Sequence, residues 1–367
     1  MRVNNRVRHK KYQLGTVISV SEDDFTVLFD EEIDGKDTRD FPKESIYSHF
    51  EQVDEDAFVE LLSNNGCEGL FHMTDINNLK RIIKDGMLYS RLHPRNSSII
   101  DSANPNVIQH TREEFKNYVR FYYKEKTPTY YNMEGILLEK TQGHIPIPCL
   151  LVFSLEATKL KHSRFSDGNA SSIHTTTYDT VSSILDGQIY EIPWDKILSR
   201  GYYESIDFAE ETRIRNAEYL IKDEVSLGFV KRIIFRSQCE LDLALKTCPD
   251  LISYHIEHDF SYFNNAGFFS SRSRQTGYNI RLFFEHIVVS YFEKNVIIDL
   301  YSDVAYEILS KFKIVVSIIN EAKEMINHEN PVPSTHISPY KIILYSETRP
   351  LRVRIFIDDI RYYIWER

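Results

Sequence analysis

The sequence predicts an α+β protein made of three regions. Its 367 residues exceed the size at which a single hydrophobic core usually stops growing, so more than one domain is expected. Alternating apolar residues near both ends of the chain predict strands, whereas the middle mixes strand-like runs with a capped helical segment. We therefore expect domains at about residues 1–60, 66–264 and 265–367.

Composition is that of an ordinary soluble globular protein, with 42% hydrophobic and 27% charged residues. No apolar run is long enough to span a bilayer and no signal-peptide pattern follows the basic N-terminus, which predicts a cytoplasmic protein without a membrane partner. The net charge of -10 argues against a protein that coats nucleic acid but allows a local basic groove. The four cysteines have no CxxC spacing, so neither a disulfide framework nor a zinc ribbon is expected.

The first region predicts a small β domain. Two alternating runs, 16–20 and 25–29, flank a turn-forming Ser-Glu-Asp-Asp stretch, which is a hairpin signal. The pattern resembles the small Tudor-like or KOW-like barrels that are appended to nucleic-acid enzymes. A stabilising or partner-binding β domain would have the same pattern, so both interpretations stay open.

The second region opens with GLFHMTDINNLKRIIKDGML. A short apolar strand carries His72 and Thr74, and the helix that follows has apolar residues at helical spacing and ends at Gly86. An isolated histidine on such a strand is more often structural than a ligand.

Glu218 heads a second informative strand, in RIRNAEYLIKDEV. Alternation places it on one face with Leu220 and Lys222, while Ala217 and Tyr219 lie on the other face. A solvated acid on a strand surface is the simple interpretation, and a catalytic carboxylate is the alternative.

The stretch NYVRFYYKEKTPTYYNMEGI interleaves aromatic residues with Arg120, Lys124 and Lys126. Proteins that bind single-stranded nucleic acid combine stacking surfaces and cations in this way. A β-rich core with solvated lysines would have the same composition.

The third region is expected to be α+β. We predict helices at about 278–292 and 302–326, followed by the strands KIILYSE and LRVRIFIDD. The nearby spacing YHIEHD suggests metal ligands, but alternation separates His255 and Glu257 from His258, so no metal site is expected.

Four stretches together carry a family resemblance: FHMTDINNLKRIIKDGML, YVRFYYKEKTPTYYNMEG, FSDGNA and RNAEYL. Residues from about 69 to 263 resemble the DarT family of ADP-ribosyltransferases. These enzymes are the toxins of toxin–antitoxin systems and move ADP-ribose from NAD onto bases of single-stranded DNA. The resemblance implies a fold in which a split pair of mixed sheets grips NAD in a cleft.

The resemblance also implies roles for individual residues. Glu218 would be the catalytic acid, with Arg112 as the best-placed catalytic arginine and Arg91 and Arg95 as alternatives. The expected NAD contacts are His72, Thr74, Gly86, Leu88 and Tyr122. The expected nucleic-acid contacts are Arg120, Lys124, Tyr202, Tyr203, Arg213 and Arg215.

These assignments fit the chemistry, because a carboxylate stabilises the oxocarbenium-like transition state and an arginine fork binds diphosphate. We expect a toxin or phage-defence enzyme with NAD as substrate, no metal, and an antitoxin partner. Asn169 replaces a histidine found in one branch of the family, and the aromatic stretch is closer to the guanine-modifying branch, so guanine and thymine both stay open. The alternatives are an RNA acceptor, or a non-catalytic nucleic-acid-binding protein with a degenerate transferase core.

Overall fold

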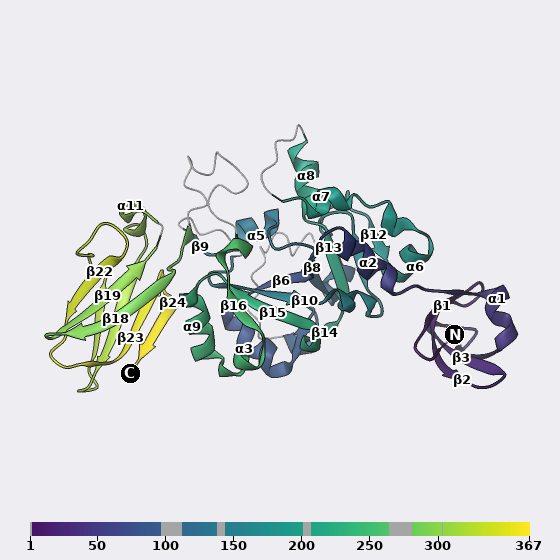
Figure 1. The fold of residues 1–367 in the computed structure, drawn as a ribbon, viewed down its shortest axis with the longest axis horizontal. Helices are drawn as coiled ribbons and strands as arrows, with labels where there is room; N and C mark the ends of the chain where they lie inside the picture. The colour runs from purple at the N-terminus through teal and green to yellow at the C-terminus, as the bar shows by residue number, and fades with distance from the viewer. Residues whose placement is uncertain (1, 97–111, 138–143, 201–206, 264–280, 303) are drawn as a thin grey trace.

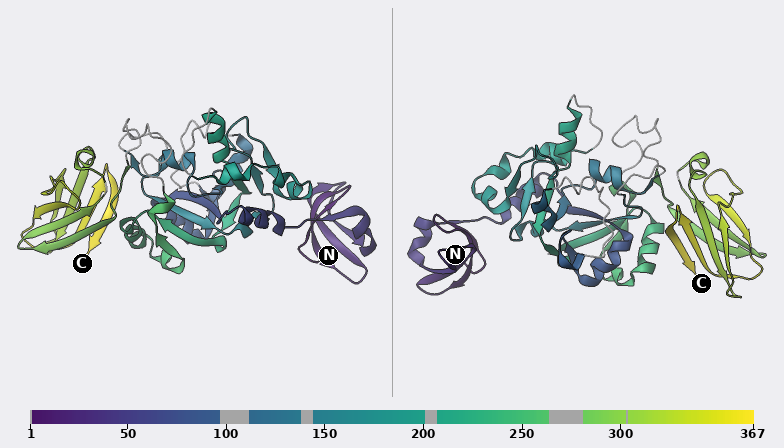
Figure 2. Two further views of the ribbon diagram at one scale, coloured as in Figure 1. Left: turned by 45° about the horizontal axis from the view of Figure 1, so that its top comes forward. Right: turned by 180° about the vertical axis from the view of Figure 1, so that it is seen from behind.

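Three sheet systems follow one another along the molecule (Figure 1 and Figure 2). A computed structural model describes residues 2–96, 112–137, 144–200, 207–263, 281–302 and 304–367. A small N-terminal sheet lies at one end, a large sheet lies in the middle, and two further sheets lie at the C-terminal end. The domain boundaries near residues 60 and 264 stay predictions. Within the described ranges, no helix has both the length and the hydrophobicity needed to cross a membrane.

The N-terminal sheet is antiparallel, with the order β4-β3-β2-β1-β5. Its strands are β1 (Arg6–His9), β2 (Gln13–Val20), β3 (Asp24–Ile33), β4 (Lys36–Pro42) and β5 (Phe50–Gln52). The predicted hairpin is confirmed, since Val17 pairs with Val27. Because β4 and β5 form opposite edges of the described sheet, the domain is an open sheet and not the closed barrel that we expected.

The central sheet has eight strands in the order β12-β11-β13-β8-β6-β10-β15-β16. Their bounds are β6 (Leu70–Asp75), β8 (Tyr118–Tyr122), β10 (Pro148–Phe153), β11 (Arg164–Ser166), β12 (Thr177–Asp179), β13 (Glu218–Lys222), β15 (Val230–Phe235) and β16 (Ile256–His258). Only β15 and β16 pair in parallel, which makes the sheet mixed. The register of β6 and β8 contains the single pair Phe71 and Tyr122, so the sheet divides there into two halves. The predicted α+β fold with a mixed sheet is confirmed, although the expected pair of sheets is joined into one sheet at this point.

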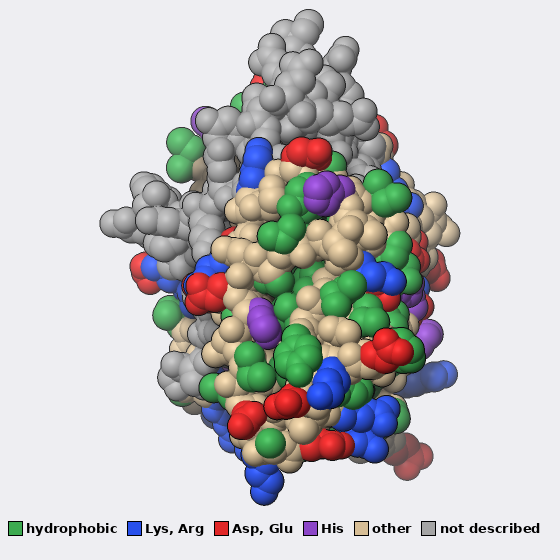
Figure 3. Space-filling model, turned by 90° about the vertical axis from the view of Figure 1, so that its left-hand side faces the viewer, with side chains coloured by type: hydrophobic (Ala, Val, Ile, Leu, Met, Phe, Trp, Pro, Cys, Tyr) green, Lys and Arg blue, Asp and Glu red, His purple; other side chains and the backbone are tan. Residues whose placement is uncertain are grey.

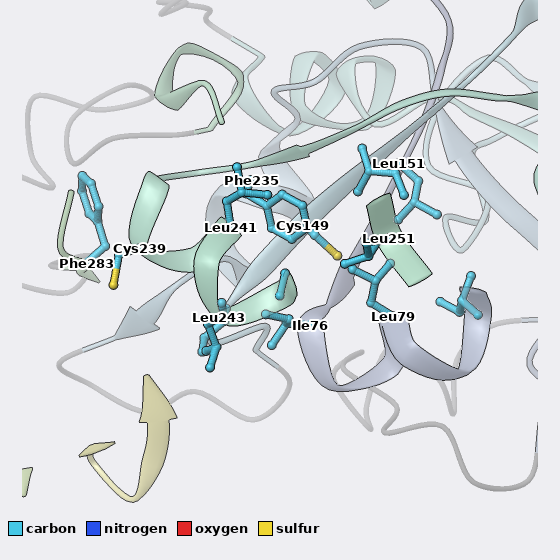
Figure 4. Packing of buried hydrophobic residues seen from close by; sticks show 14 of the residues in the cluster. Ile76, Leu79, Cys149, Leu151, Phe235, Cys239, Leu241, Leu243, Leu251 and Phe283 are labelled. Atoms are coloured by element: carbon cyan, nitrogen blue, oxygen red, sulfur yellow. The ribbon is translucent and has the colours of Figure 1, made fainter. Parts of the chain in front are cut away.

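Helix α3 (Ile76–Asp85) follows β6 and covers one face of this sheet. Asp75 caps its N-terminus by accepting a hydrogen bond from the backbone N–H of Asn77, and Gly86 ends it at a left-handed φ of 65°. The apolar face of α3 packs with α9 (Gln238–Thr247) against the strands, as Ile76, Leu79 and Leu241 show beside Cys149 (Figure 4). Burial of this apolar surface positions β6, which borders the split, and its neighbour β10.

The other face of the central sheet carries α5 (Pro128–Met133), whose Tyr130 packs against Phe71 and Tyr122. The remaining helices of the region are α2 (Asp56–Asn64), α6 (Thr180–Leu185), α7 (Trp194–Leu198) and α8 (Phe208–Arg215). A short two-stranded sheet joins β7 (Met87–Tyr89) to β14 (Glu224–Ser226).

The C-terminal region is a β-sandwich, so the two predicted helices were wrong where the structure describes them. One sheet contains β18 (His286–Phe292), β19 (Asn295–Tyr301) and β22 (Tyr340–Tyr345), and the other contains β20 (Ile314–Asn320), β21 (Met325–Glu329), β23 (Pro350–Ile357) and β24 (Ile360–Glu366). Every second residue of β19 is buried, at Val296, Ile298 and Leu300, and Glu293 and Lys294 both take the positive φ values of a tight hairpin turn. The two predicted strands are confirmed as β22 and β23, and α11 (Tyr306–Leu309) is a single helical turn.

This sandwich is bonded to the central region through α9. The ion pair between Arg236 and Glu240 is fully buried, and the hydroxyl of Tyr362 in β24 donates to Glu240 Oε1 over 3.1 Å. A further link is the pairing of β17 (Arg281–Leu282) with β9 (Ile136–Leu137). At the outer end of the sandwich, hydrophobic side chains gather among charged ones (Figure 3).

Candidate active site

Glu218 is the first residue of β13 and lies between β11 and β8. Its alternation is as predicted: Tyr219 and Ile221 enter the main core, whereas Leu220 packs on the opposite face with Phe115. Glu218 itself is 1% exposed. The solvated-acid interpretation is therefore wrong, and a buried carboxylate needs partners to offset the loss of water.

The carboxylate of Glu218 is bonded to a backbone N–H and a guanidinium, and it also interacts with the hydroxyl of Tyr122. Oε2 accepts a hydrogen bond of 2.8 Å from the backbone N–H of Ala170, and Oε1 lies 3.5 Å from Nη1 of Arg120. The backbone N–H of Glu218 donates to Ser166 Oγ over 2.9 Å. Because Ser166 and Ala170 belong to the FSDGNA segment, that segment fixes both the backbone and the carboxylate of Glu218.

Arg120 is the arginine that the structure brings to Glu218. It lies on β8 and pairs with Leu220, so its side chain crosses the ladder towards Glu218. Nη1 also donates to Ser171 Oγ over 3.2 Å, while Nη2 is buried without a hydrogen-bond partner among the described residues. An unpaired guanidinium donor beside a carboxylate fits an anionic substrate group such as a phosphate.

The side chain of Arg112, the expected catalytic arginine, is 44% exposed, and its Nη1 lies 3.9 Å from Oε1 of Glu114. Its Nη2 donates to the carbonyl of Thr175 over 3.4 Å, and its guanidinium lies 5.3 Å from the centre of the Phe115 ring. Of the alternatives, Arg95 donates to the hydroxyl of Tyr89. The position of Arg120 beside Glu218 could not be read from local sequence patterns, because the strand register that brings them together pairs segments 98 residues apart.

His72 lies on β6, next to the split, and its side chain bonds to β8, the strand that contains Arg120. Its Nδ1 donates to the carbonyl of Arg120 over 3.0 Å, which leaves Nε2 as the acceptor nitrogen. Burial lowers the pKa of His72, so the ring is neutral at neutral pH. A neutral acceptor of this kind suits a hydroxyl or amino donor.

The other expected NAD contacts are placed differently. Tyr122 pairs with Glu218 across the ladder, and burial, followed by the charge of Glu218, raises the pKa of its hydroxyl. Thr74 is buried and its Oγ1 accepts from Asn78 of α3. Gly86 forms the left-handed end of α3, and Leu88 is buried in the core. Packing and capping account for Gly86 and Leu88 without a ligand, and the NAD-binding roles of all five residues stay predictions.

Three cations expected to meet nucleic acid are engaged within the protein. Lys124 is 3% exposed and donates to the carbonyl of Ser199 over 2.8 Å, and burial lowers its pKa to about 7. Arg213 and Arg215 both lie on α8, and each forms an ion pair within this helix. The charges of all three are bonded to other groups of the protein, and their nucleic-acid contacts stay predictions. Tyr202 and Tyr203 lie outside the described residues.

The described residues contain no group of three His, Cys, Asp or Glu side chains placed to hold a metal ion. All four cysteines are buried and unpaired with one another. Of the histidines of YHIEHD, His258 ends β16, an edge strand of the central sheet, and His255 directly precedes this strand.

Comparison with known proteins gives one family. Residues 71–251 match the sequence model of the family described as "ssDNA thymidine ADP-ribosyltransferase, DarT". A comparison with curated proteins gives no match.

Solved structures of three complexes are similar to the chain. DarT of Thermus sp. 2.9 in complex with ADP-ribosylated ssDNA is 20% identical, with 53% of this chain and 95% of that chain covered and a TM-score of 0.42. The same protein in complex with NAD+ is 18% identical, with 54% and 98% covered and a TM-score of 0.42. DarTG of Thermosipho africanus in complex with ADP-ribose is 15% identical, with 53% and 50% covered and a TM-score of 0.43.

The family match covers β6, α3, β8, β10, β11, β13 and α9, and with them Glu218, Arg120, His72 and the FSDGNA segment. Residues 71–251 therefore form a DarT domain, and the protein is an NAD-dependent ADP-ribosyltransferase that acts on single-stranded DNA.

Proposed function

We propose that Glu218 is the catalytic carboxylate of this transferase and that Arg120 is its cationic partner. The observation that supports this most directly is the burial of Glu218 between the N–H of Ala170 and the guanidinium of Arg120. A structural core would more simply contain an apolar residue here, because a buried ion pair is seldom worth more than apolar packing of the same volume. The same observation favours catalysis over a degenerate, non-catalytic core.

The reaction breaks the bond between nicotinamide and C1 of its ribose and forms a bond from that carbon to a base nitrogen. Positive charge develops on the sugar as nicotinamide leaves, and the carboxylate of Glu218 stabilises it. The base nitrogen gives up its proton as the new bond forms, and Glu218 would accept it, which is help typically worth about 10² to 10⁴ in rate. The unpaired Nη2 of Arg120 would bind the diphosphate, and Nε2 of His72 would accept from a ribose hydroxyl or the adenine amino group.

Thymidine is the acceptor that the family description favours, and we propose it as the first base to test. Asn169 lies beside Ala170, and its side-chain oxygen accepts from the backbone N–H of Ser171, so it belongs to the turn that holds Glu218. The resemblance of the aromatic stretch to the guanine-modifying branch makes guanine the second base to test.

We further propose that the protein acts in the cytoplasm as the toxin of a toxin–antitoxin pair. NAD and single-stranded DNA meet there during replication, and a modified template base would stop copying. An enzyme with this activity needs a partner that removes the modification or blocks the site.

The experiment incubates the protein and NAD with single-stranded oligonucleotides and measures the added mass on each base. We expect ADP-ribose on one base of the wild-type reaction and a loss of at least about 100-fold in Glu218→Gln, which keeps the shape but removes the charge and the base. The matched control is Glu224→Gln, which changes a half-exposed carboxylate of the nearby strand β14. Near-normal transfer by Glu218→Gln would refute the assignment, and labelling of RNA or protein alone would refute the acceptor.

A further inference from the structure

The turn between β11 and β12 supplies the only backbone group bonded to the carboxylate of Glu218 within the described residues, the N–H of Ala170. We propose that Arg213 is a positioning residue for catalysis, which holds this turn so that Ala170 stays aimed at Glu218. The proposal rests on the proposed function, because it takes Glu218 as the catalytic group. It replaces the expectation that Arg213 binds the phosphates of the acceptor strand.

The side chain of Arg213 bonds to the turn at its start and at its end. Nη1 donates to Asp167 Oδ1 over 2.9 Å and to Thr175 Oγ1 over 3.3 Å. Asp167 in turn accepts from the backbone N–H of Thr176 over 3.0 Å. One planar cation therefore ties together the two ends of the segment 167–176, whose middle contains Ala170.

The backbone of Arg213 holds the middle of the same turn. Its carbonyl accepts from the N–H of Asn169, the residue directly before Ala170, over 2.9 Å. Gly168 lies so close that a Cβ added there would be 2.3 Å from Nη1 of Arg213 and 3.0 Å from its carbonyl oxygen. The turn and Arg213 are thus in direct contact, and a Cβ at position 168 would displace the Arg213 side chain.

Two further bonds orient Arg213 itself. Nε and Nη2 both donate to the carboxylate of Glu210, each over 2.7 Å, within α8. A side chain that is 14% exposed and bonded to Glu210, Asp167 and Thr175 has few donors left for a DNA phosphate. Helix α8 ends at Arg215, just before β13 begins at Glu218. The turn that contacts Arg213 in this helix also bonds to the carboxylate of Glu218, so it holds both.

Two roles of Arg213 predict different kinetics. If it positions Glu218, its loss misplaces a group that acts in the transition state, so kcat falls while the KM values for NAD and oligonucleotide stay nearly unchanged. Hydrolysis of NAD without acceptor must fall by the same factor. If Arg213 binds phosphate instead, the KM for oligonucleotide rises, the salt dependence weakens, and NAD hydrolysis is unaffected.

The test compares full-length Arg213→Ala, Arg213→Lys and Gly168→Ala with the wild type. We expect kcat to fall at least about 10-fold in Arg213→Ala for both transfer and NAD hydrolysis, with partial recovery in Arg213→Lys, which can still bond to Asp167. Gly168→Ala should reproduce the loss without removing a charge, since the methyl group displaces Arg213 from the turn. Glu224→Gln, which changes a half-exposed carboxylate of β14, is the control and should retain kcat within about two-fold.

The outcomes separate this inference from the proposed function. A rise in oligonucleotide KM with unchanged NAD hydrolysis in Arg213→Ala, or wild-type kcat in folded Gly168→Ala, would overturn the positioning role alone. Near-normal kcat in Glu218→Gln would overturn the proposed catalytic group and the inference with it. Thermal unfolding of each variant shows which of them are folded, and Gly168→Ala tests the proposal if Arg213→Ala does not fold.

Discussion

Lys124 lies buried just after β8, where its ammonium group donates to the carbonyl of Ser199 over 2.8 Å. Burial, together with the charge of Arg215, lowers its pKa from 10.5 to about 7, although Glu125 and Glu211 act in the opposite direction. Lys124 therefore binds its proton more tightly in the unfolded chain than in the folded protein. We expect Lys124→Met to stabilise the protein at neutral pH.

The magnitude follows from the two pKa values. Each tenfold change in proton affinity is worth about 1.4 kcal/mol, so the charged lysine lowers the free energy of unfolding by up to about 5 kcal/mol at pH 6. Loss of the hydrogen bond leaves the Ser199 carbonyl unpaired, which costs about 1–3 kcal/mol. The net gain of Lys124→Met should be about 2 kcal/mol at pH 7.

The sign of the pH dependence is fixed by the direction of the pKa shift. Between pH 7 and 10.5 the unfolded state carries more protons at Lys124, so wild-type stability rises with pH by up to about 1.4 kcal/mol per pH unit from this group. The advantage of Lys124→Met therefore shrinks over this range and is largely gone near pH 9.

The assay is urea unfolding followed by the fluorescence of Trp194, which is buried in the central core, in a Trp365→Phe background. Lys231→Met is the control, since Lys231 also donates to a backbone carbonyl but is exposed, and it should change stability by less than about 0.5 kcal/mol. A destabilised Lys124→Met at pH 7, or an advantage that does not change with pH, would refute the reasoning.

Two further predictions concern other buried groups. Burial, with the charges of His49 and Lys11, lowers the pKa of His9, so the N-terminal sheet should lose stability as the pH falls below about 6.5. Proteolysis within residues 6–52 of the wild type should therefore be faster at pH 5.5 than at pH 7.5. A His9→Phe variant with the same pH response would contradict this prediction. Burial raises the pKa of Cys67 to about 12, and Cys149, Cys239 and Cys248 are also buried. Native protein at pH 8 should therefore react slowly with Ellman's reagent and rapidly in urea, and fast labelling without urea would show that the thiols are accessible.

The position of Glu218 could be predicted from the sequence because it depends on local alternation along one strand. The identity of its partner could not, because Arg120 reaches it only through the register between β8 and β13. The split sheet followed from the family resemblance, and the structure shows it as the single pair between Phe71 and Tyr122.

The errors have physical causes as well. In the C-terminal region, runs of Val and Ile were read as helical although they alternate in and out of a sandwich core. Charged side chains such as Lys124 and Arg213 were expected at the surface, since cations are seldom buried, and their internal partners are distant in sequence or lie in a turn that local patterns do not describe.

The buried ion pair of Arg236 and Glu240 implies that the C-terminal sandwich and the transferase domain evolved together. Glu240 lies within the family match, but the hydroxyl that donates to it belongs to Tyr362, more than a hundred residues beyond the end of that match. A descendant that lost the sandwich would expose one side of α9 and leave Glu240 without this donor. Such a lineage should carry replacements at Arg236 and Glu240, whereas lineages that keep the sandwich should change these residues and Tyr362 together.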